Sequence, residues 1–173
     1  MQIIPADERH IHKIIDIARE TWQHTYTNII SQQQIDYMLN LFYTAEGIRE
    51  QLQTPGHHFF IALRANEILG YAHAIENEQD EYSIKLSKLY VYPHTQGGGA
   101  GKLLMQAVEA KARKLLKRRI ILNVNRMNPA KDFYFRQGFS IVQEIDIPLA
   151  QYWLNDYIME KNLFGDISEN STD

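Results

Sequence analysis

The sequence contains no cysteine. This excludes disulfide bonds, thiolate nucleophiles and zinc sites that use cysteine ligands. Long apolar runs are also missing: stretches such as residues 120–122 are far too short to cross a bilayer. No basic segment followed by an apolar stretch stands at the N-terminus, so no signal peptide is expected. We therefore expect a cytoplasmic protein with no membrane partner.

Neither sign of charge is in large excess. The formal net charge is −3 and the pI is near 6.2, so a broad nucleic-acid-binding surface is not expected. Basic residues do gather within 102–119 and acidic ones within 76–81. Such a basic stripe could serve one anionic ligand, although a solvated helix face has the same composition.

The overall composition is that of an ordinary globular domain. Of 173 residues, 45% are hydrophobic and 23% are charged, which suits a single domain with a sizeable core. No repeat or linker interrupts the chain before its polar end. We expect one domain over residues 1–165 and a frayed tail over 166–173.

Apolar periodicity predicts an α/β protein with helices near the N-terminus and strands from residue 59 onward. Strands are expected at 2–4, 59–63, 68–75, 84–92, 120–124, 139–147 and 156–161. Helices are expected after caps at Asp7 and Ser31 and over 45–52, 99–117 and 130–137. The strand–helix–strand order around 99–117 implies one parallel pair in a mostly antiparallel sheet.

Two details of this pattern bear on the site. Simple alternation along 84–92 places Ile84, Leu86, Lys88 and Tyr90 on one face of the sheet. The apolar stripe of the helix over 99–117 runs to its end, where it includes Leu115 and Leu116.

The most informative segment is a glycine-rich turn between a predicted strand and the helix that follows it. Helix N-termini present unpaired N–H groups and a positive potential. Glycines that adopt positive φ allow successive N–H groups to converge on a phosphate. Lys102 in the first helical turn opposes the helix dipole, which makes sense if a polyanion binds there.

Two familiar nucleotide-binding patterns do not fit this turn. A P-loop would need glycine at 96 and Ser or Thr at 103, where Gln96 and Leu103 stand. A dinucleotide fingerprint starting at Gly97 would need glycine at position 102, which is a lysine. The turn does satisfy the pattern Gln/Arg-x-x-Gly-x-Gly/Ala, through Gln96, Gly99 and Gly101. A merely flexible loop remains the alternative.

A second motif follows at 122–139, where an Asn-rich loop precedes Phe133-Tyr134 and then Gly138-Phe139. With both motifs in this order, the chain resembles the GNAT N-acetyltransferases, most strongly over 85–139. Segments 20–26 and 155–159 are similar to the PaiA-like polyamine-acetylating branch. The resemblance implies a central sheet of about six to seven strands, flanked by about four to five helices, whose central parallel pair splays apart. It also implies acetyl-CoA as co-substrate and acetylation of a small amine or polyamine.

The resemblance assigns roles to residues of both motifs. The backbone of one strand would pair with the pantetheine arm, main-chain amides of the turn would hold the pyrophosphate, and Tyr134 would protonate the departing thiolate as general acid. A strand N–H, such as that of Val91, could polarise the thioester carbonyl. The expected cofactor-binding residues are Leu89, Tyr90, Val91, Gln96, Gly97, Gly98, Gly99, Ala100, Gly101, Lys102, Asn128 and Tyr134. The alternative for Tyr134 is an aromatic ring packed on the sheet.

The chain departs from the family pattern in two places. The strand segment 85–89 lacks the glutamate that many relatives use as a base, and Asn128 stands one residue closer to Tyr134 than usual. Glu20, His24, His73 or water could remove the proton from the amine instead.

No metal is expected, because the adjacent His57 and His58 would point to opposite faces of a strand. Trp22, Tyr26 and Tyr37 could form an aromatic pocket for a cationic acceptor.

Rival functions stay open at this point. They are a protein or peptide N-acetyltransferase and a non-catalytic acyl-CoA sensor on the same fold. A homodimer, built through the last strand as in relatives, is also possible. The sequence does not identify the acceptor amine.

Overall fold

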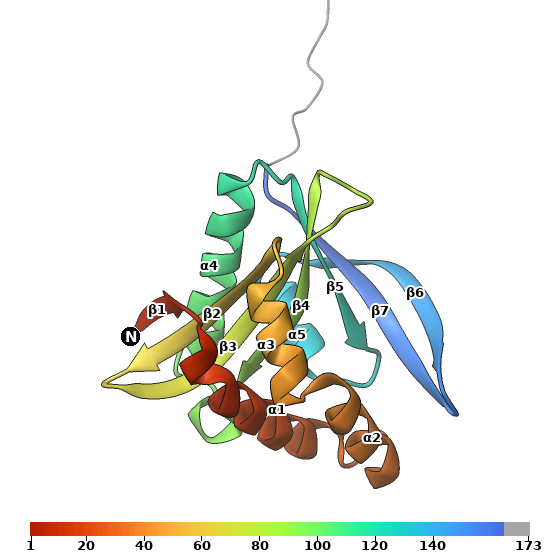
Figure 1. Cartoon of the computed structure of the whole chain (residues 1–173). Coiled ribbons are helices and arrows are strands. Elements are labelled where there is room, and N and C mark those ends of the chain that lie inside the picture. The colour runs from red at the N-terminus through yellow and green to blue at the C-terminus, as the bar shows by residue number, and fades with distance from the viewer. Residues whose placement is uncertain (165–173) are drawn as a thin grey trace, which may run out of the picture.

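A seven-stranded sheet runs through the molecule in the order β1-β2-β3-β4-β5-β7-β6 (Figure 1). This computed structural model describes residues 1–164, so the predicted tail lies outside the described residues. The strands are β1 (Gln2–Pro5), β2 (His57–Arg64), β3 (Glu67–Glu76), β4 (Ser83–Val91), β5 (Arg119–Asn125), β6 (Ser140–Leu149) and β7 (Tyr152–Asn162). All neighbours are antiparallel except β4 and β5, which confirms the predicted mixed sheet.

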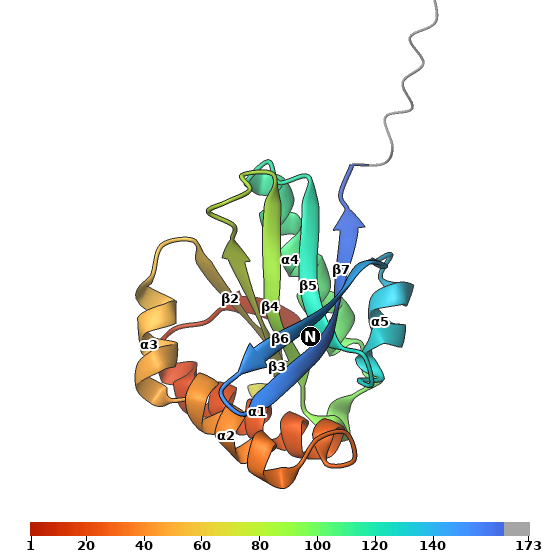
Figure 2. The same ribbon diagram turned by 90° about the vertical axis from the view of Figure 1, so that its right-hand side faces the viewer.

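Helices cover both faces of the sheet, as the two ribbon views show (Figures 1 and 2). They are α1 (Ile11–Tyr26), α2 (Gln32–Phe42), α3 (Ala45–Gln53), α4 (Ala100–Lys114) and α5 (Ala130–Arg136). One core lies between the sheet and α4–α5, and the other lies between the sheet and α1–α3. Ser31 caps α2 as predicted, whereas Asp7 caps a short 3-10 turn that leads into α1. No helix within residues 1–164 is long and apolar enough to cross a membrane.

The C-terminal end of α4 differs from the expected stripe. Leu116 is 79% exposed, and only Leu115 packs partly against the core. The helix stops because Leu116 adopts φ +59°, and the N–H of Lys117 then bonds to the carbonyl of Ala112 at 2.9 Å. This Schellman-type ending turns the chain toward β5 and leaves Leu116 in solvent.

A β-bulge in β4 corrects the expected alternation along that strand. His73 of β3 pairs with Lys88 and Ala74 pairs with Leu86, so Ser87 is the extra residue. An extra residue exchanges the two faces of the strand beyond it. Ile84 and Leu86 therefore pack in the α4 core, whereas Lys88 and Tyr90 face α1–α3.

The parallel pair splays apart, as the family resemblance implied. β4 and β5 pair at Ser83–Arg119, Ile84–Ile120 and Lys85–Ile121, and the pairing stops there. Beyond this point β5 pairs with β7 on its other side, while the rest of β4 continues beside β3. A wedge thus opens between the C-terminal halves of β4 and β5 (Figure 1).

Gly70 permits the close approach of β3 and β4 beside this wedge. A Cβ at Gly70 would lie 2.5 Å from the carbonyl oxygen of Tyr90 and 3.0 Å from the Cα of Val91. We expect Gly70→Ala to lower the free energy of unfolding by about 1–3 kcal/mol in urea denaturation, because backbone atoms cannot give way as a flexible side chain can. Gly101→Ala is the control, since its nearest neighbours are side-chain atoms at 3.5–3.8 Å. Equal stability of the Gly70 variant and the wild type would contradict this packing.

Candidate active site

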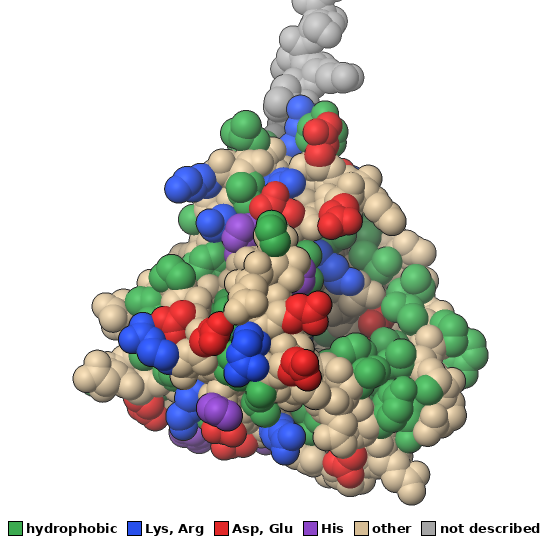
Figure 3. Space-filling model, in the orientation of Figure 1, with side chains coloured by type: hydrophobic (Ala, Val, Ile, Leu, Met, Phe, Trp, Pro, Cys, Tyr) green, Lys and Arg blue, Asp and Glu red, His purple; other side chains and the backbone are tan. Residues whose placement is uncertain are grey.

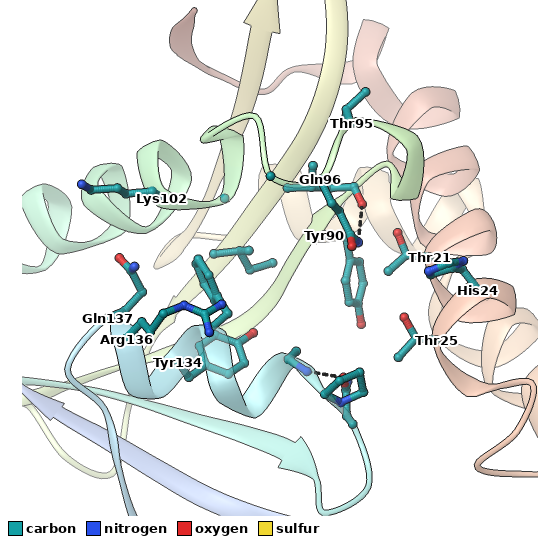
Figure 4. A pocket seen from close by; sticks show the side chains of 18 of the residues that line it. Thr21, His24, Thr25, Tyr90, Thr95, Gln96, Lys102, Tyr134, Arg136 and Gln137 are labelled. Carbon is teal, nitrogen blue, oxygen red and sulfur yellow. Dashed lines mark hydrogen bonds between the residues drawn. The ribbon is translucent and has the colours of Figure 1, made fainter.

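A cavity of about 580 Å³ lies at the C-terminal end of β4, between α1 on one side and α4 and α5 on the other (Figure 4). We call it the turn cavity, because the glycine-rich turn forms part of its wall. The predicted cofactor residues that line it are Leu89, Tyr90, Val91, Gln96, Gly97, Gly99, Gly101, Lys102, Asn128 and Tyr134. Gly98 and Ala100 do not line it, and Ala100 is buried in the α4 core.

The turn leaves backbone donors free at the start of α4. Gly97 and Gly99 adopt φ +82° and +87°, a region that residues with side chains rarely enter. Gly99 caps α4 without a side-chain hydrogen bond, and the first helical N–H is that of Leu103, bonded to the carbonyl of Gly99 at 3.1 Å. The N–H of Gly98 bonds to the carbonyl of Thr95, whereas those of residues 99–102 have no backbone partner within the described chain and are available to an anion.

Tyr134 packs its ring in the core and also lines the turn cavity. Its ring, on α5, packs edge-on against Phe133 and Phe139 with centroid separations of 5.4 and 5.7 Å. Its hydroxyl points into the turn cavity, in the direction of Tyr90 (Figure 4). Burial raises the pKa of Tyr134 well above its usual value, so the hydroxyl keeps its proton and can donate it.

Asn128 ties the β5–α5 loop to α1. Its Oδ1 accepts a hydrogen bond from the N–H of Ala130 at 2.9 Å, and its Nδ2 donates to the Tyr26 hydroxyl at 3.0 Å. The Asn128 side chain thus bonds to the first residue of α5 and fixes the start of the helix that carries Tyr134. Its expected contact with the cofactor stays a prediction.

A second cavity, of about 290 Å³, lies on the helical face between α1–α2 and the strands β4, β5 and β7. We call it the acceptor cavity, after the role that we propose for it. Figure 3 shows a hollow in this face, with basic side chains at its edge and an acidic one inside. Tyr26 and Tyr90 line both cavities, so the two meet at these side chains.

Asp156 of β7 lines the acceptor cavity. Burial raises the pKa of this carboxyl group above its usual value. A cation bound beside it would stabilise the charged carboxylate. The sequence placed Asp156 inside the PaiA-like segment 155–159 but did not single it out. The signal that reveals it is long-range, since the β5–β7 register sets it opposite Asn125.

Residues 26–162 match the family model described as an acetyltransferase (GNAT) domain. The chain belongs to the GNAT acetyltransferase family.

Individual relatives agree with this assignment. An uncharacterised N-acetyltransferase of Mycobacterium bovis is 30% identical over 148 residues, covering 85% of this chain and 94% of that protein. A spermidine N(1)-acetyltransferase of Thermoplasma acidophilum is 27% identical over 160 residues, covering 87% and 90% respectively. The crystal structure of a PaiA N-acetyltransferase from T. acidophilum in complex with coenzyme A shares the fold. Its TM-score is 0.80 at 23% identity, over 94% of this chain and 99% of that one. The predicted family, fold and enzyme class, an N-acetyltransferase that uses acetyl-CoA, are thereby confirmed.

The candidate bases lie in different places within this GNAT enzyme. His24 of α1 lines the turn cavity, whereas Glu20 is exposed on the same helix and lines neither cavity. His73 also lines neither cavity, because it is fully buried in β3. Burial lowers the pKa of His73 to about 2, so its ring is neutral. Neither Glu20 nor His73 can therefore touch an amine in these cavities.

The other predicted features are partly brought together. The rings of Trp22 and Tyr26 line the acceptor cavity with centroids 4.7 Å apart and planes tilted by 40°, but Tyr37 lies outside it and packs against Tyr152. His57 and His58 have different partners, and no group of three or more metal-binding side chains gathers within residues 1–164. Sequence reasoning missed five polar residues that line the turn cavity, namely Thr21, Thr25, Thr95, Arg136 and Gln137. The buried Thr21 hydroxyl has no hydrogen-bond partner within the described chain.

Proposed function

We propose that this GNAT enzyme transfers the acetyl group of acetyl-CoA directly to a primary amine of a small molecule, with a polyamine as the first candidate. The observation that carries the proposal is the meeting of two cavities at the wedge between β4 and β5. One cavity holds the anion-binding turn and the other holds Asp156. Direct transfer requires both reactants to be aligned in one site, and this arrangement supplies that alignment.

The turn cavity suits acetyl-CoA. The free N–H groups at the start of α4 would bind the diphosphate, and Lys102 and Arg136 line the same cavity with positive charge. The edge of β4 at residues 89–91, which β5 leaves unpaired, would receive the pantetheine arm. The amine nitrogen then bonds to the thioester carbon as the C–S bond breaks, and the departing sulfur takes the proton of Tyr134. The new amide nitrogen loses one proton in turn, which restores the Tyr134 hydroxyl.

The acceptor cavity suits a small cationic amine. Asp156 offers a carboxylate, and Trp22, Tyr26 and Tyr43 offer aromatic surface to an ammonium group. Its volume of about 290 Å³ favours a small molecule over a folded protein chain. The similarity to a spermidine acetyltransferase supports a polyamine as the first compound to try.

Release of free thiol from acetyl-CoA tests this function directly. The purified protein is incubated with acetyl-CoA and a panel of spermidine, diaminoalkanes, aminoglycosides and N-terminal peptides. We expect thiol release that depends on the amine and is fastest with the small di- and polyamines. Turnover with peptides alone, or none with any amine, would contradict the proposal.

Gly99→Val tests the turn as the acetyl-CoA site. A β-branched residue is strained at φ +87°, so the turn should reorganise and its N–H groups should diverge. We expect the Kd for acetyl-CoA in calorimetry to rise by about tenfold or more. Gly56→Val is the matched control, because Gly56 has φ +80° in a turn that lines neither cavity. Equal affinity in both variants would remove the turn from the binding site.

The homodimer stays a prediction, but the last strand, β7, lies between β5 and β6 in the sheet of residues 1–164 and has no free edge there for a second copy. β6 forms an edge of the sheet and carries the exposed side chains of Ile141 and Val142. Pairing of a second copy along this edge would cover them, and light scattering would show the doubled mass.

A further inference from the structure

A short chain of hydrogen bonds runs from the acceptor cavity into the sheet. Lys88 lines the cavity, and its Nζ lies 3.4 Å from Nδ1 of His73 and 3.3 Å from Oγ of Ser87. Nε2 of His73 lies 3.0 Å from Nδ1 of His57. Three ionisable side chains from β4, β3 and β2 are thus linked in series, and Lys88 alone of the three reaches the acceptor cavity.

The fold holds this chain rigidly. The bulge at Ser87 turns Lys88 toward the acceptor cavity instead of the α4 core. The His73 ring stacks on Phe59 at a centroid distance of 3.8 Å and an interplanar angle of 11°. When Lys88 is protonated it can only donate, so Nδ1 of the neutral His73 accepts and the His73 proton sits on Nε2, facing His57. This fixed tautomer holds the Lys88 amine in one place.

Lys88 is an unusual lysine in its surroundings. Within residues 1–164 no carboxylate lies within 4 Å of its Nζ, and the Tyr43 ring centroid is 5.7 Å away. Burial, and then the positive charge of Lys85, lower the pKa of Lys88 to about 8. The ionisable groups that face it or share its cavity come from several elements: Tyr26 of α1, Tyr43 after α2, His73 of β3, Lys85 and Tyr90 of β4, and Asp156 of β7. A cationic acceptor in the same cavity disfavours a second cation, so it binds the neutral form of Lys88.

We propose that Lys88 is the base that removes the proton from the ammonium group of the acceptor, and that His73 is the positioning residue that holds it. This inference rests on the proposed function, because it needs an amine in the acceptor cavity. One N–H bond of the ammonium breaks and a new N–H bond forms at Nζ of Lys88. The freed lone pair attacks the thioester carbon, and Lys88 returns the proton to water after the product leaves. Lys88 would thus act as the base in place of the strand glutamate that many relatives use. It lies within the segment 85–89, where that glutamate is missing.

The pH dependence of turnover distinguishes a base from a structural lysine. A base must be neutral, so kcat/KM should rise with pH to a midpoint near 8 and level off above it. In Lys88→Met the amine must lose its proton unaided, so kcat at neutral pH should fall by about 10²-fold or more. The midpoint should then move up by about two pH units, toward the acceptor's own ammonium. Spermidine is the probe amine and free thiol is the readout.

The absence of native cysteine allows a sharper variant. Lys88→Cys, alkylated with 2-bromoethylamine, places at this site alone an amine more acidic than that of lysine. We expect it to restore most of the activity with a midpoint below that of the wild type, which a purely structural lysine would not produce. His58→Gln is the control for the nearby histidines, because His58 pairs with Glu76 on the other face and should leave the profile unchanged.

The outcomes separate cleanly. If Lys88→Met kept the wild-type pH midpoint and a kcat within about threefold of the wild-type value, Lys88 would not be the base. So would alkylation that restores activity without moving the midpoint. If no amine is turned over, the proposed function fails. The pH dependence of Lys88 labelling by acetic anhydride still tests Lys88, and a midpoint near that of a surface lysine overturns its role even then.

Discussion

Tyr134→Phe is expected to lower kcat by about 10²–10⁴-fold while acetyl-CoA binds as in the wild type. The hydroxyl faces the turn cavity, and the raised pKa of Tyr134 keeps it protonated at neutral pH. Its removal leaves the departing thiolate without a proton donor, but the ring still packs against Phe133 and Phe139. Thiol release measures kcat, and calorimetry measures the affinity for acetyl-CoA.

Tyr152→Phe is the matched control, because Tyr152 packs against Tyr37 outside both cavities and should keep full activity. If Tyr134→Phe kept the wild-type kcat, Tyr134 would not be the general acid. A wild-type protein that binds acetyl-CoA but turns over no amine would instead fit the sensor, the alternative left open by the sequence.

Asp156→Asn is expected to lower kcat/KM for spermidine by about 30-fold or more, with no change in acetyl-CoA affinity. The loss should appear mainly in KM, because the carboxylate lines the acceptor cavity and not the turn cavity. Partial burial makes the attraction for an ammonium group stronger than it would be in water. Steady-state kinetics over a range of amine concentrations gives both parameters.

Asp146→Asn provides the comparison, since Asp146 is exposed on β6 and bonds to Arg126 and Asn155. If Asp146→Asn and Asp156→Asn lost the same small amount of activity, the acceptor would not lie against Asp156. The proposal of a polyamine acceptor would then lose its main structural support.

The parts of the site that could be predicted are those set by neighbouring residues. Positive φ at Gly97 and Gly99, the start of α4 and the placement of Tyr134 on a helix after β5 all follow from short motifs. Their chemistry is local, because a helix N-terminus and its turn need only the residues that form them.

The parts that failed depend on long-range pairing. Lys88 was assigned to the face of Leu86, because a bulge shows only when β3 and β4 are aligned. His73 was a candidate base from its residue type alone, yet the strand places it in the core. The position of Asp156 in the acceptor cavity depends on the β5–β7 register, which no local sequence pattern predicts.

A crystal structure of the enzyme with bound acetyl-CoA tests the central claim most directly. The diphosphate should be hydrogen-bonded to main-chain N–H groups within residues 97–102, and the thioester should lie in the wedge between β4 and β5 within reach of the Tyr134 hydroxyl. A cofactor bound elsewhere, or one whose diphosphate is held by side chains alone, would contradict the account.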